Sequence, residues 1–448
     1  METSCFYSFL DEKEKEISSG KADIRFNDLS ISIRPAFGET LAFSFRDVAS
    51  VESAEYRVKL CLATNETVIL SELGYTYEDF IRLFNKSRNA LIIKDMLMSE
   101  SLKYPGVQSD YECFSESGTS LQKGACEVIL YDTALVVVPE KAELMRIPYA
   151  EVTGLGAGDY TFTVKTEFDG TLVFSKMGRQ TDPFNRKLSD ILNDISEKTQ
   201  AVLKSIAPEA GPSVVQKAAG FLKDGKAARK SDIESASPEL WKKFEEKIEK
   251  TELKEEYAFL KSIARQEKIC IGVKRELVGK LGGGEGEYIW CLIPVYGIGG
   301  KTGGNAIAME SITTTAEGKG KATYFFKIAP RSDLDRFKTE AAMDTQTDMA
   351  LTAINRCMLA INFRRQPVFL SEAKLNEPQY ERYKFSIQKI PGLRVLRSSF
   401  IGRVVHANDA QWQDDVRNLL KFNVSSKDDD ARWIKGELED SEIEKDDS

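Results

Sequence analysis

Residues 130–175 read LYDTALVVVPEKAELMRIPYAEVTGLGAGDYTFTVKTEFDGTLVFS, and residues 26–71 read FNDLSISIRPAFGETLAFSFRDVASVESAEYRVKLCLATNETVILS. When the wider stretches 26–84 and 130–188 are aligned at an offset of 104 residues, they share ten identities in 59 ungapped positions. Many of the other pairs keep their apolar character and phase. The alignment therefore indicates that a whole domain is duplicated within the chain. The identical pairs are Asp28/Asp132, Pro35/Pro139, Glu39/Glu143, Val48/Val152, Tyr56/Tyr160, Thr67/Thr171, Ser71/Ser175, Gly74/Gly178, Phe80/Phe184 and Arg82/Arg186.

Each copy shows the pattern of short strands followed by one helix. Apolar residues recur at every second position, as in YTFTVKTE (160–167), which is typical of half-buried strands. Asp169-Gly170 lies between two such runs and predicts a hairpin turn. In the second copy, Asp182 followed by Pro183 indicates the start of a helix, and apolar residues then follow at helical spacing.

This order of elements resembles the pleckstrin-homology-like (PH-like) superfold, a partly open β-barrel closed by a C-terminal helix. The resemblance covers residues 21–103 (copy one) and 120–206 (copy two). It implies binding of phosphoinositides, peptides or other proteins. Members that bind lipids carry basic residues at the first hairpin, whereas this chain has Asn27-Asp28 and Tyr131-Asp132 there. The acidic turns argue against phosphoinositide binding.

The remaining sequence predicts three further parts. Residues 207–236 are rich in Ala, Gly, Ser and Pro and indicate a linker with a short helix. Residues 237–424 alternate helical and strand patterns and predict an α+β domain that resembles no family. Residues 425–448 hold ten acids and four bases and predict a disordered acidic tail. The expected fold class is therefore α+β, with two tandem PH-like barrels, a helical linker and an α+β domain.

Charge and cysteine content indicate which partners and which cellular compartment to expect. The formal charge is −8; the tail accounts for −6, which leaves −2 on the rest, so the chain lacks the cationic excess that broad nucleic-acid binding requires. Seven cysteines without a CxxC pair indicate reduced thiols and a cytoplasmic protein. The apolar run 288–296 is far shorter than a membrane-spanning helix. A weak basic amphipathic segment within 207–236 leaves membrane-surface docking as an alternative.

One sequence motif carries a specific chemical hypothesis. Gly297, Gly299, Gly300, Lys301 and Thr302 follow an apolar run and end in GKT, as a phosphate-binding loop does. The first glycine of that motif is replaced by Val295. We therefore interpret the stretch as a Gly-rich hairpin loop, with nucleotide binding as the alternative.

Other candidate residues are isolated. His406 is the one histidine of the chain, so multi-histidine metal sites are excluded and histidine catalysis could use only this residue. Asp344 and Asp348 share a helix face but have no partner motif. A basic stretch interleaved with aromatics suggests surface charge or anion contact. Its cations are Arg382, Lys384, Lys389, Arg394, Arg397 and Arg403.

The sequence thus predicts no catalytic residue, no metal site and no cofactor. We expect a non-enzymatic binding or scaffolding protein that recognises a protein or peptide through grooves or sheet edges of its PH-like domains. The alternatives are a nucleotide-binding protein using residues 297–302, a membrane-surface adaptor, and a histone-chaperone-like protein, since tandem barrels followed by an acidic tail resemble histone-chaperone middle regions.

Overall fold

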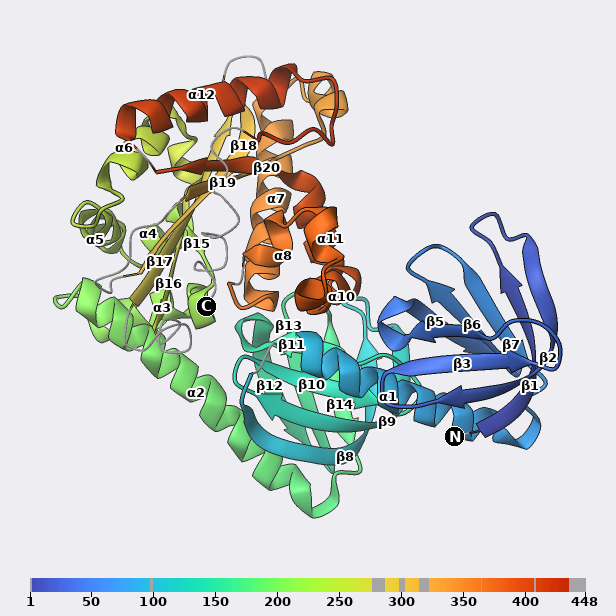
Figure 1. The fold of residues 1–448 in the computed structure, drawn as a ribbon. Helices are drawn as coiled ribbons and strands as arrows, with labels where there is room; N and C mark the ends of the chain where they lie inside the picture. Colours follow the sequence, from blue (N-terminus) through green and yellow to red (C-terminus); the bar gives the residue numbers. More distant parts are fainter. Residues whose placement is uncertain are drawn as a thin grey trace. The chain divides into compact units, whose positions relative to one another are not determined.

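The computed structural model describes residues 2–96, 100–275, 287–297, 303–313, 322–363, 365–406 and 408–434. The chain forms two compact units. The first comprises Met1–Ser189 together with Glu372–Lys389, and the second comprises Asp190–Ser371 together with Ile390–Ser448. Figure 1 shows antiparallel sheets and helices in both units, so the predicted α+β class is confirmed.

The first sheet of unit one has seven strands in the order β4-β3-β2-β1-β7-β6-β5 and is followed by helix α1. We call this part copy one. Its strands are β1 (Glu2–Leu10), β2 (Glu16–Phe26), β3 (Ser30–Pro35), β4 (Leu41–Ser44), β5 (Val48–Ala54), β6 (Arg57–Leu62) and β7 (Thr67–Ser71); a 3-10 turn η1 (Phe45–Asp47) joins β4 to β5, and α1 spans Tyr77–Met96.

The second sheet, in copy two, repeats this topology strand for strand, in the order β11-β10-β9-β8-β14-β13-β12. From β3 to the start of α1, every element of copy one recurs in copy two 104 residues later, which is the offset of the sequence repeat. The elements are β8 (Leu102–Phe114), β9 (Ser120–Tyr131), β10 (Ala134–Pro139), β11 (Met145–Pro148), β12 (Val152–Gly158), β13 (Thr161–Thr166), β14 (Thr171–Ser175) and α2 (Thr181–Ile206).

Both sheets also contain a strand that precedes the expected ranges 21–103 and 120–206. Strand β1 pairs with β2 and β7, and β8 pairs with β9 and β14. These strands join the two halves of each sheet, because without them β7 and β14 would have no neighbour on that side. Each repeat is therefore longer than the stretch in which sequence similarity is visible.

Alternating burial explains why these segments form strands. In β6, Val58, Leu60 and Leu62 are buried, while the residues between them are not. The same period places Phe162 and Val164 of β13 inside copy two. Helix α1 adds aromatic side chains to the core of copy one: Phe84 packs edge-on against Phe45 with ring centroids 5.1 Å apart.

The predicted hairpin at Asp169-Gly170 is present. The Thr166 amide donates to the Gly170 carbonyl, and Gly170 has φ of 74°. A Cβ at this position would lie 2.0 Å from the Phe114 carbonyl oxygen, so only glycine fits the turn.

Unit one is completed by a segment from far along the chain. Residues 372–389 contain the short helix α9 (Glu372–Leu375) and helix α10 (Glu381–Lys389). Helix α10 packs against α1 of copy one. The sequence pattern predicts these residues within the C-terminal α+β domain (237–424), whereas in the structure they belong to unit one.

Unit two is built on a six-stranded antiparallel meander in the order β15-β16-β17-β18-β19-β20. Figure 1 shows helices on both faces of this sheet. The strands are β15 (Ala228–Arg229), β16 (Cys270–Arg275), β17 (Glu287–Tyr296), β18 (Asn305–Thr313), β19 (Ala322–Lys327) and β20 (Phe400–Val405). The helices are α3 (Pro212–Phe221), α4 (Lys230–Ala236), α5 (Pro238–Ile248), α6 (Lys254–Ile263), α7 (Glu340–Ala360), α8 (Gln366–Phe369), α11 (Pro391–Ser399) and α12 (Asp409–Ser425), together with the C-terminal part of α2.

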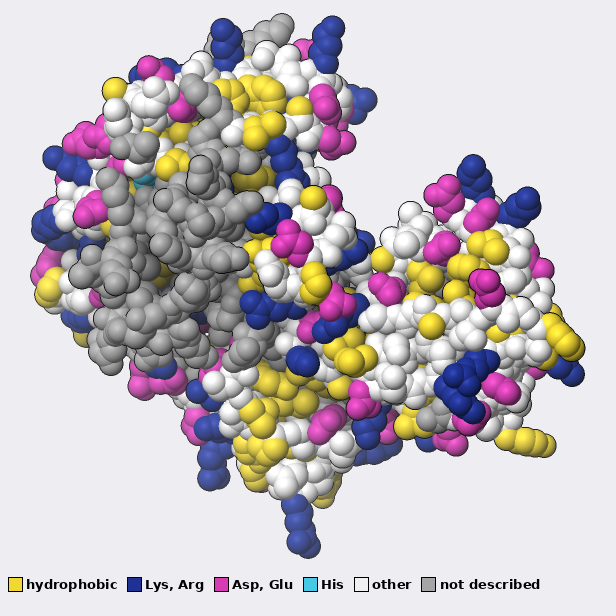
Figure 2. All heavy atoms as spheres, in the orientation of Figure 1, with side chains coloured by type: hydrophobic (Ala, Val, Ile, Leu, Met, Phe, Trp, Pro, Cys, Tyr) yellow, Lys and Arg dark blue, Asp and Glu magenta, His cyan; other side chains and the backbone are white. Residues whose placement is uncertain are grey.

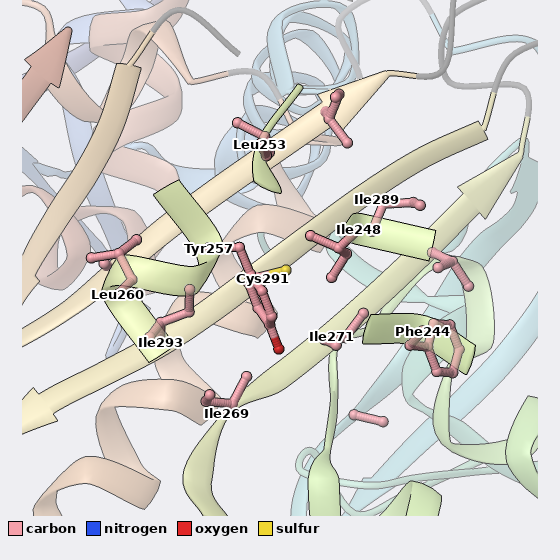
Figure 3. Packing of buried hydrophobic residues seen from close by; sticks show 14 of the residues in the cluster. Phe244, Ile248, Leu253, Tyr257, Leu260, Ile269, Ile271, Ile289, Cys291 and Ile293 are labelled. Carbon is pink, nitrogen blue, oxygen red and sulfur yellow. The ribbon is translucent and has the colours of Figure 1, made fainter. Parts of the chain in front are cut away.

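Strand β17 is buried on both faces, which explains its continuous apolar run. Figure 3 shows Cys291 and Ile293 of β17 packed among apolar side chains of α5 and α6, such as Tyr257. On the opposite face, Trp290 contacts Phe363, with ring centroids 5.3 Å apart.

Residues 207–236, predicted as a linker with a short helix, contain helices α3 and α4. Val215 and Ala218 of α3 and Ile233 of α4 lie in the main hydrophobic core of unit two. Ala219 of α3 and Ala228 of β15 also belong to this core.

The first part of the predicted disordered tail is ordered. The Trp433 amide donates to the Ile401 carbonyl at 2.6 Å, and Trp433 forms a β-bridge with Gly402 of β20. Residues 435–448 lie outside the described residues. Within the described ranges, no helix has both the length and the apolar character needed to cross a bilayer.

Candidate protein-interaction surface

In copy one, the edge strand β5 and helix α1 form a surface on which α10 is held. Lys389, at the end of α10, donates from Nζ to the Ala49 carbonyl of β5 at 2.6 Å. Arg88 of α1 donates from Nη2 to the Val48 carbonyl at 3.2 Å. Two cationic side chains thus cover backbone carbonyls at the start of an edge strand, whose polar groups would otherwise be available to another chain.

A carboxylate of copy two completes this junction. Glu143, in the β10–β11 loop, lies 2.7 Å from Arg88 Nη2 and 3.2 Å from Lys389 Nζ. The Arg88 side chain is fully buried and that of Lys389 is 1% exposed, whereas Glu143 is 38% exposed. One acid therefore neutralises cations from two segments, and this contact fixes copy one, copy two and α10 to each other inside unit one.

The other end of α10 is held by a second arginine. Arg46, in the η1 turn, binds Asp95 of α1 at 2.6 Å and Glu381 of α10 at 2.9 Å. Because of its hydrogen bond with Asp95, the pKa of Arg46 is raised above its usual value. Helix α10 is thus bound at both of its ends. The β5–α1 surface of copy one is occupied by a segment of the chain itself.

The corresponding edge of copy two has a different composition. Strand β12 reads VTGLGAG and contains no charged residue, whereas β5 contains Glu52. In the sheet formed by the described strands, β12 pairs only with β13. Thr153 and Gly156 are exposed, and a Cβ at Gly154 would meet no atom within 4 Å. Packing does not require these glycines, and they leave the backbone open to close approach by another chain.

An exposed tyrosine lies at the end of this edge. Tyr160, in the β12–β13 turn, has φ of 56° and is 90% exposed. Its counterpart Tyr56 has φ of 59°, but its ring lies 5.4 Å from that of Tyr77. The residue of copy two that corresponds to Tyr77 is Thr181. A bulky residue in the left-handed region is strained, and such strain tends to occur at functional positions.

The Gly-rich loop cannot be assessed from the structure. Gly297 follows β17 and is buried. Gly299, Gly300, Lys301 and Thr302 lie outside the described residues, so the nucleotide alternative stays a prediction.

His406 lies in a buried polar cluster of unit two. Its Nε2 is 3.1 Å from Glu310 Oε1 and 3.0 Å from Thr323 Oγ1. Its Nδ1 is 3.8 Å from Glu256 Oε1, and the imidazole is 1% exposed. Burial is the main cause that raises the pKa of the Glu256 carboxyl, and the neighbouring Glu310 raises it further. The cluster is enclosed by protein, which suits a structural role for the histidine.

The two aspartates of α7 do not form a joint site. Asp348 pairs with Lys268 at 3.0 Å, whereas Asp344 accepts a hydrogen bond from the Tyr296 hydroxyl. In the parts of the chain that the structure describes, no group of three or more potential ligands is placed to hold a metal ion.

The basic stretch is divided between the two units. Lys389 belongs to the junction described above, and the Arg382 guanidinium lies over the Tyr383 ring at 4.8 Å. Arg397 is buried in unit two and donates to the Pro367 and Leu370 carbonyls. Figure 2 shows basic and acidic side chains interspersed on the visible face, in agreement with the small net charge of the body.

The junction residues were not identified from the sequence. Arg88 and Ala49 are brought together by tertiary pairing and carry no local motif, and Glu143 stands out only as one of the ten identities between the copies. Tyr160 had a detectable signal, because it is one of the ten identities between the copies. The alternating glycines of β12 were a second signal.

Comparisons with known proteins give little. No family model matches the chain, and no curated protein matches it. A search of solved structures finds similarity to a chain from "Structure of the Spt16D Pob3N heterodimer", at 14% identity, over 39% of this chain and 94% of that chain. The TM-score is 0.16. A score this low is no basis for a shared fold or function.

Proposed function

We propose that copies one and two are PH-like domains and that the protein is a non-enzymatic protein-recognition module. Copy two binds an extended peptide segment of a partner by adding it as a strand to the edge of β12 over residues 153–158, with Tyr160 as an aromatic anchor. Strand addition supplies affinity through backbone hydrogen bonds, and side-chain contacts supply specificity.

The observation that carries this proposal is that β12 is an edge strand without charged residues. Natural sheets protect exposed edges with charges, prolines or covering segments. Copy one has such protection: Glu52 lies in β5, and α10 covers the start of that strand through Lys389 and Ala49. Strand β12 has no charge and ends beside a tyrosine that is 90% exposed. Exposed tyrosines are frequent anchors at binding interfaces.

The experiment is a selection of peptides from a random library on the full-length protein, followed by affinity measurements with the selected peptides. The test variant is Gly154→Lys, because its side chain enters open space and the fold should tolerate it. Ser50→Lys is the matched control, since Ser50 is the exposed counterpart in copy one. We expect Gly154→Lys to weaken binding by roughly tenfold or more, the equivalent of one or two backbone hydrogen bonds, and Ser50→Lys to have no effect.

Hydrogen exchange locates the bound peptide. If the proposal holds, amides of β12 become protected when peptide is added, and those of β5 do not change. The proposal fails if no peptide is selected. It also fails if selected peptides bind the Gly154→Lys variant as tightly as they bind the wild type.

A further inference from the structure

Among the described residues of unit two, three arginines are buried, and two of them donate hydrogen bonds to backbone carbonyls. Arg331 donates from Nε to the Asn423 carbonyl at 2.7 Å and from Nη2 to the Ala431 carbonyl at 3.2 Å, and thereby holds the segment after α12. Arg397 donates to the Pro367 and Leu370 carbonyls at 2.8 and 2.9 Å and thereby fixes the segment around α8. These two arginines have structural roles.

Arg403 of β20 differs from both. It is 3% exposed, and its Nη1 has no hydrogen-bond acceptor among the described residues. Across the same residues, its guanidinium forms no ion pair with a carboxylate. Burying a cation without a counter-charge is costly. An unsatisfied buried donor of this kind requires an explanation, such as an ion that binds there.

The surroundings of Arg403 favour an anion. The face of its guanidinium lies over the Phe369 ring, with 4.8 Å from Cζ to the ring centroid. The centroid of the Phe369 ring lies 5.9 Å from that of Tyr324, and Cζ of Arg365 lies 5.1 Å from the Tyr324 centroid. Stacking uses the flat face of a guanidinium and leaves the N–H groups at its edge able to donate.

Two residues around Arg403 are less buried than Arg403 itself, because Arg365 and Phe369 are half-buried. The Arg365 guanidinium also donates from Nη1 to Ser311 Oγ at 3.4 Å, which holds the second cation beside the rings. Two guanidinium groups and a layer of aromatic rings thus gather within one small region of unit two.

We propose that Arg403, with Arg365, forms a binding site for a small oxyanion of the phosphate or carboxylate type. The planar fork of a guanidinium matches two oxygens of such an anion, and a partly buried environment strengthens charge-assisted hydrogen bonds. The bound oxyanion supplies the acceptor that Arg403 Nη1 lacks. This site is independent of the peptide-binding edge of copy two.

The test measures thermal unfolding of the full-length protein in increasing sodium phosphate or sodium acetate, with sodium chloride at equal ionic strength as the reference. A ligand that binds the folded state raises the melting temperature in a saturable way. The variant is Arg403→Met, and Arg394→Met is the control because Arg394 is exposed on neighbouring α11. We expect Arg403→Met to weaken anion binding by roughly 10- to 100-fold and Arg394→Met to leave it unchanged.

The two anions separate the sources of the oxyanion. A response to phosphate alone assigns a phosphate-type ligand, and a response to acetate assigns a carboxylate-type ligand. If Arg403→Met does not fold, Arg403→Lys replaces it, and titration of wild-type protein labelled with 15N-arginine reports whether a guanidinium signal shifts. The proposal is overturned if neither anion binds saturably, or if the Arg403 variants bind as the wild type does.

Discussion

Lys389 and Ala49 are separated by 340 residues in the sequence and joined by a hydrogen bond of 2.6 Å from Nζ to the carbonyl oxygen. This contact brings a helix from the C-terminal half of the chain into unit one. The same ammonium group lies 3.2 Å from Glu143 of copy two. A helix remote in sequence is therefore part of the structure that holds the two copies together, and its charges can be tested one at a time.

Glu143→Gln should destabilise unit one, because Glu143 forms ion pairs with both Arg88 and Lys389. Since Glu143 is partly exposed, we expect a loss of about 1–3 kcal/mol in the free energy of unfolding, measured by urea denaturation. The control is Glu140→Gln in the same loop, whose partner Arg82 is 51% exposed at 3.4 Å and whose removal should change stability by less than about 0.5 kcal/mol. If both variants lower the free energy of unfolding equally, the ion pairs of Glu143 stabilise unit one no more than an exposed surface ion pair does.

The pH dependence of stability should report the buried pair Glu256 and His406. Burial raises the pKa of Glu256 above 4.5 in the folded chain, so the folded state binds this proton more tightly than the unfolded state does. The resulting stability is complete below about pH 4.5 and is lost as the pH rises through the folded-state pKa. Among the charged neighbours, His406 opposes the shift, while Glu310 and Asp409 add to it.

Glu256→Gln should therefore be more stable than the wild type at neutral pH, and this advantage should shrink as the pH falls towards 4.5. Urea denaturation at a series of pH values measures the difference. Glu255→Gln, on the exposed side of α6, is the control and should show no pH-dependent difference. The raised pKa of Glu256 would be contradicted if the stability difference between Glu256→Gln and the wild type did not change with pH. It would also be contradicted if the variant became less stable than the wild type towards neutral pH.

Thiol reactivity should distinguish Cys61 from the six other cysteines. Cys61 is partly exposed, whereas the others are buried. Burial raises the pKa of Cys5, Cys126 and Cys270 to about 12, so these thiols stay protonated at pH 8. With Ellman's reagent we expect one fast-reacting thiol in the native chain and seven after unfolding in urea. The variant Cys61→Ser should lose the fast phase, and a second fast thiol in that variant would show that a buried cysteine is accessible.

Local patterns were enough to predict much of the fold. The 104-residue offset and the alternation in runs such as 160–167 predicted the repeated strands and the hairpin at Asp169-Gly170, because these depend on neighbouring residues. Tertiary packing decides other segments: Leu393 and Leu396 of α11 are buried in unit two.

The sites depended on contacts that a single sequence does not reveal. Arg403 Nη1 has no acceptor among the described residues because of its environment, and the sequence showed Arg403 only as one cation in a basic stretch. The pairing of Lys389 with Ala49 requires that a distant helix return to copy one. Such relationships arise from tertiary packing, and hydrophobic periodicity carries no information about them.

The last prediction concerns Gly402 and the segment that follows α12. A Cβ at Gly402 would lie 2.5 Å from the Trp433 carbonyl oxygen, so Gly402→Ala should displace the Trp433 backbone from β20. The hydrogen bond from the Trp433 amide to Ile401 would then be lost. We expect trypsin to cleave after Arg432 at least several-fold faster in this variant, because protection of the segment depends on that pairing.

Gly392→Ala on α11 is the matched control. Its added Cβ meets no atom within 4 Å, and alanine favours the helix, so cleavage after Arg432 should stay at the wild-type rate. Unchanged cleavage in Gly402→Ala would mean that the contact between Gly402 and Trp433 does not hold the segment in place.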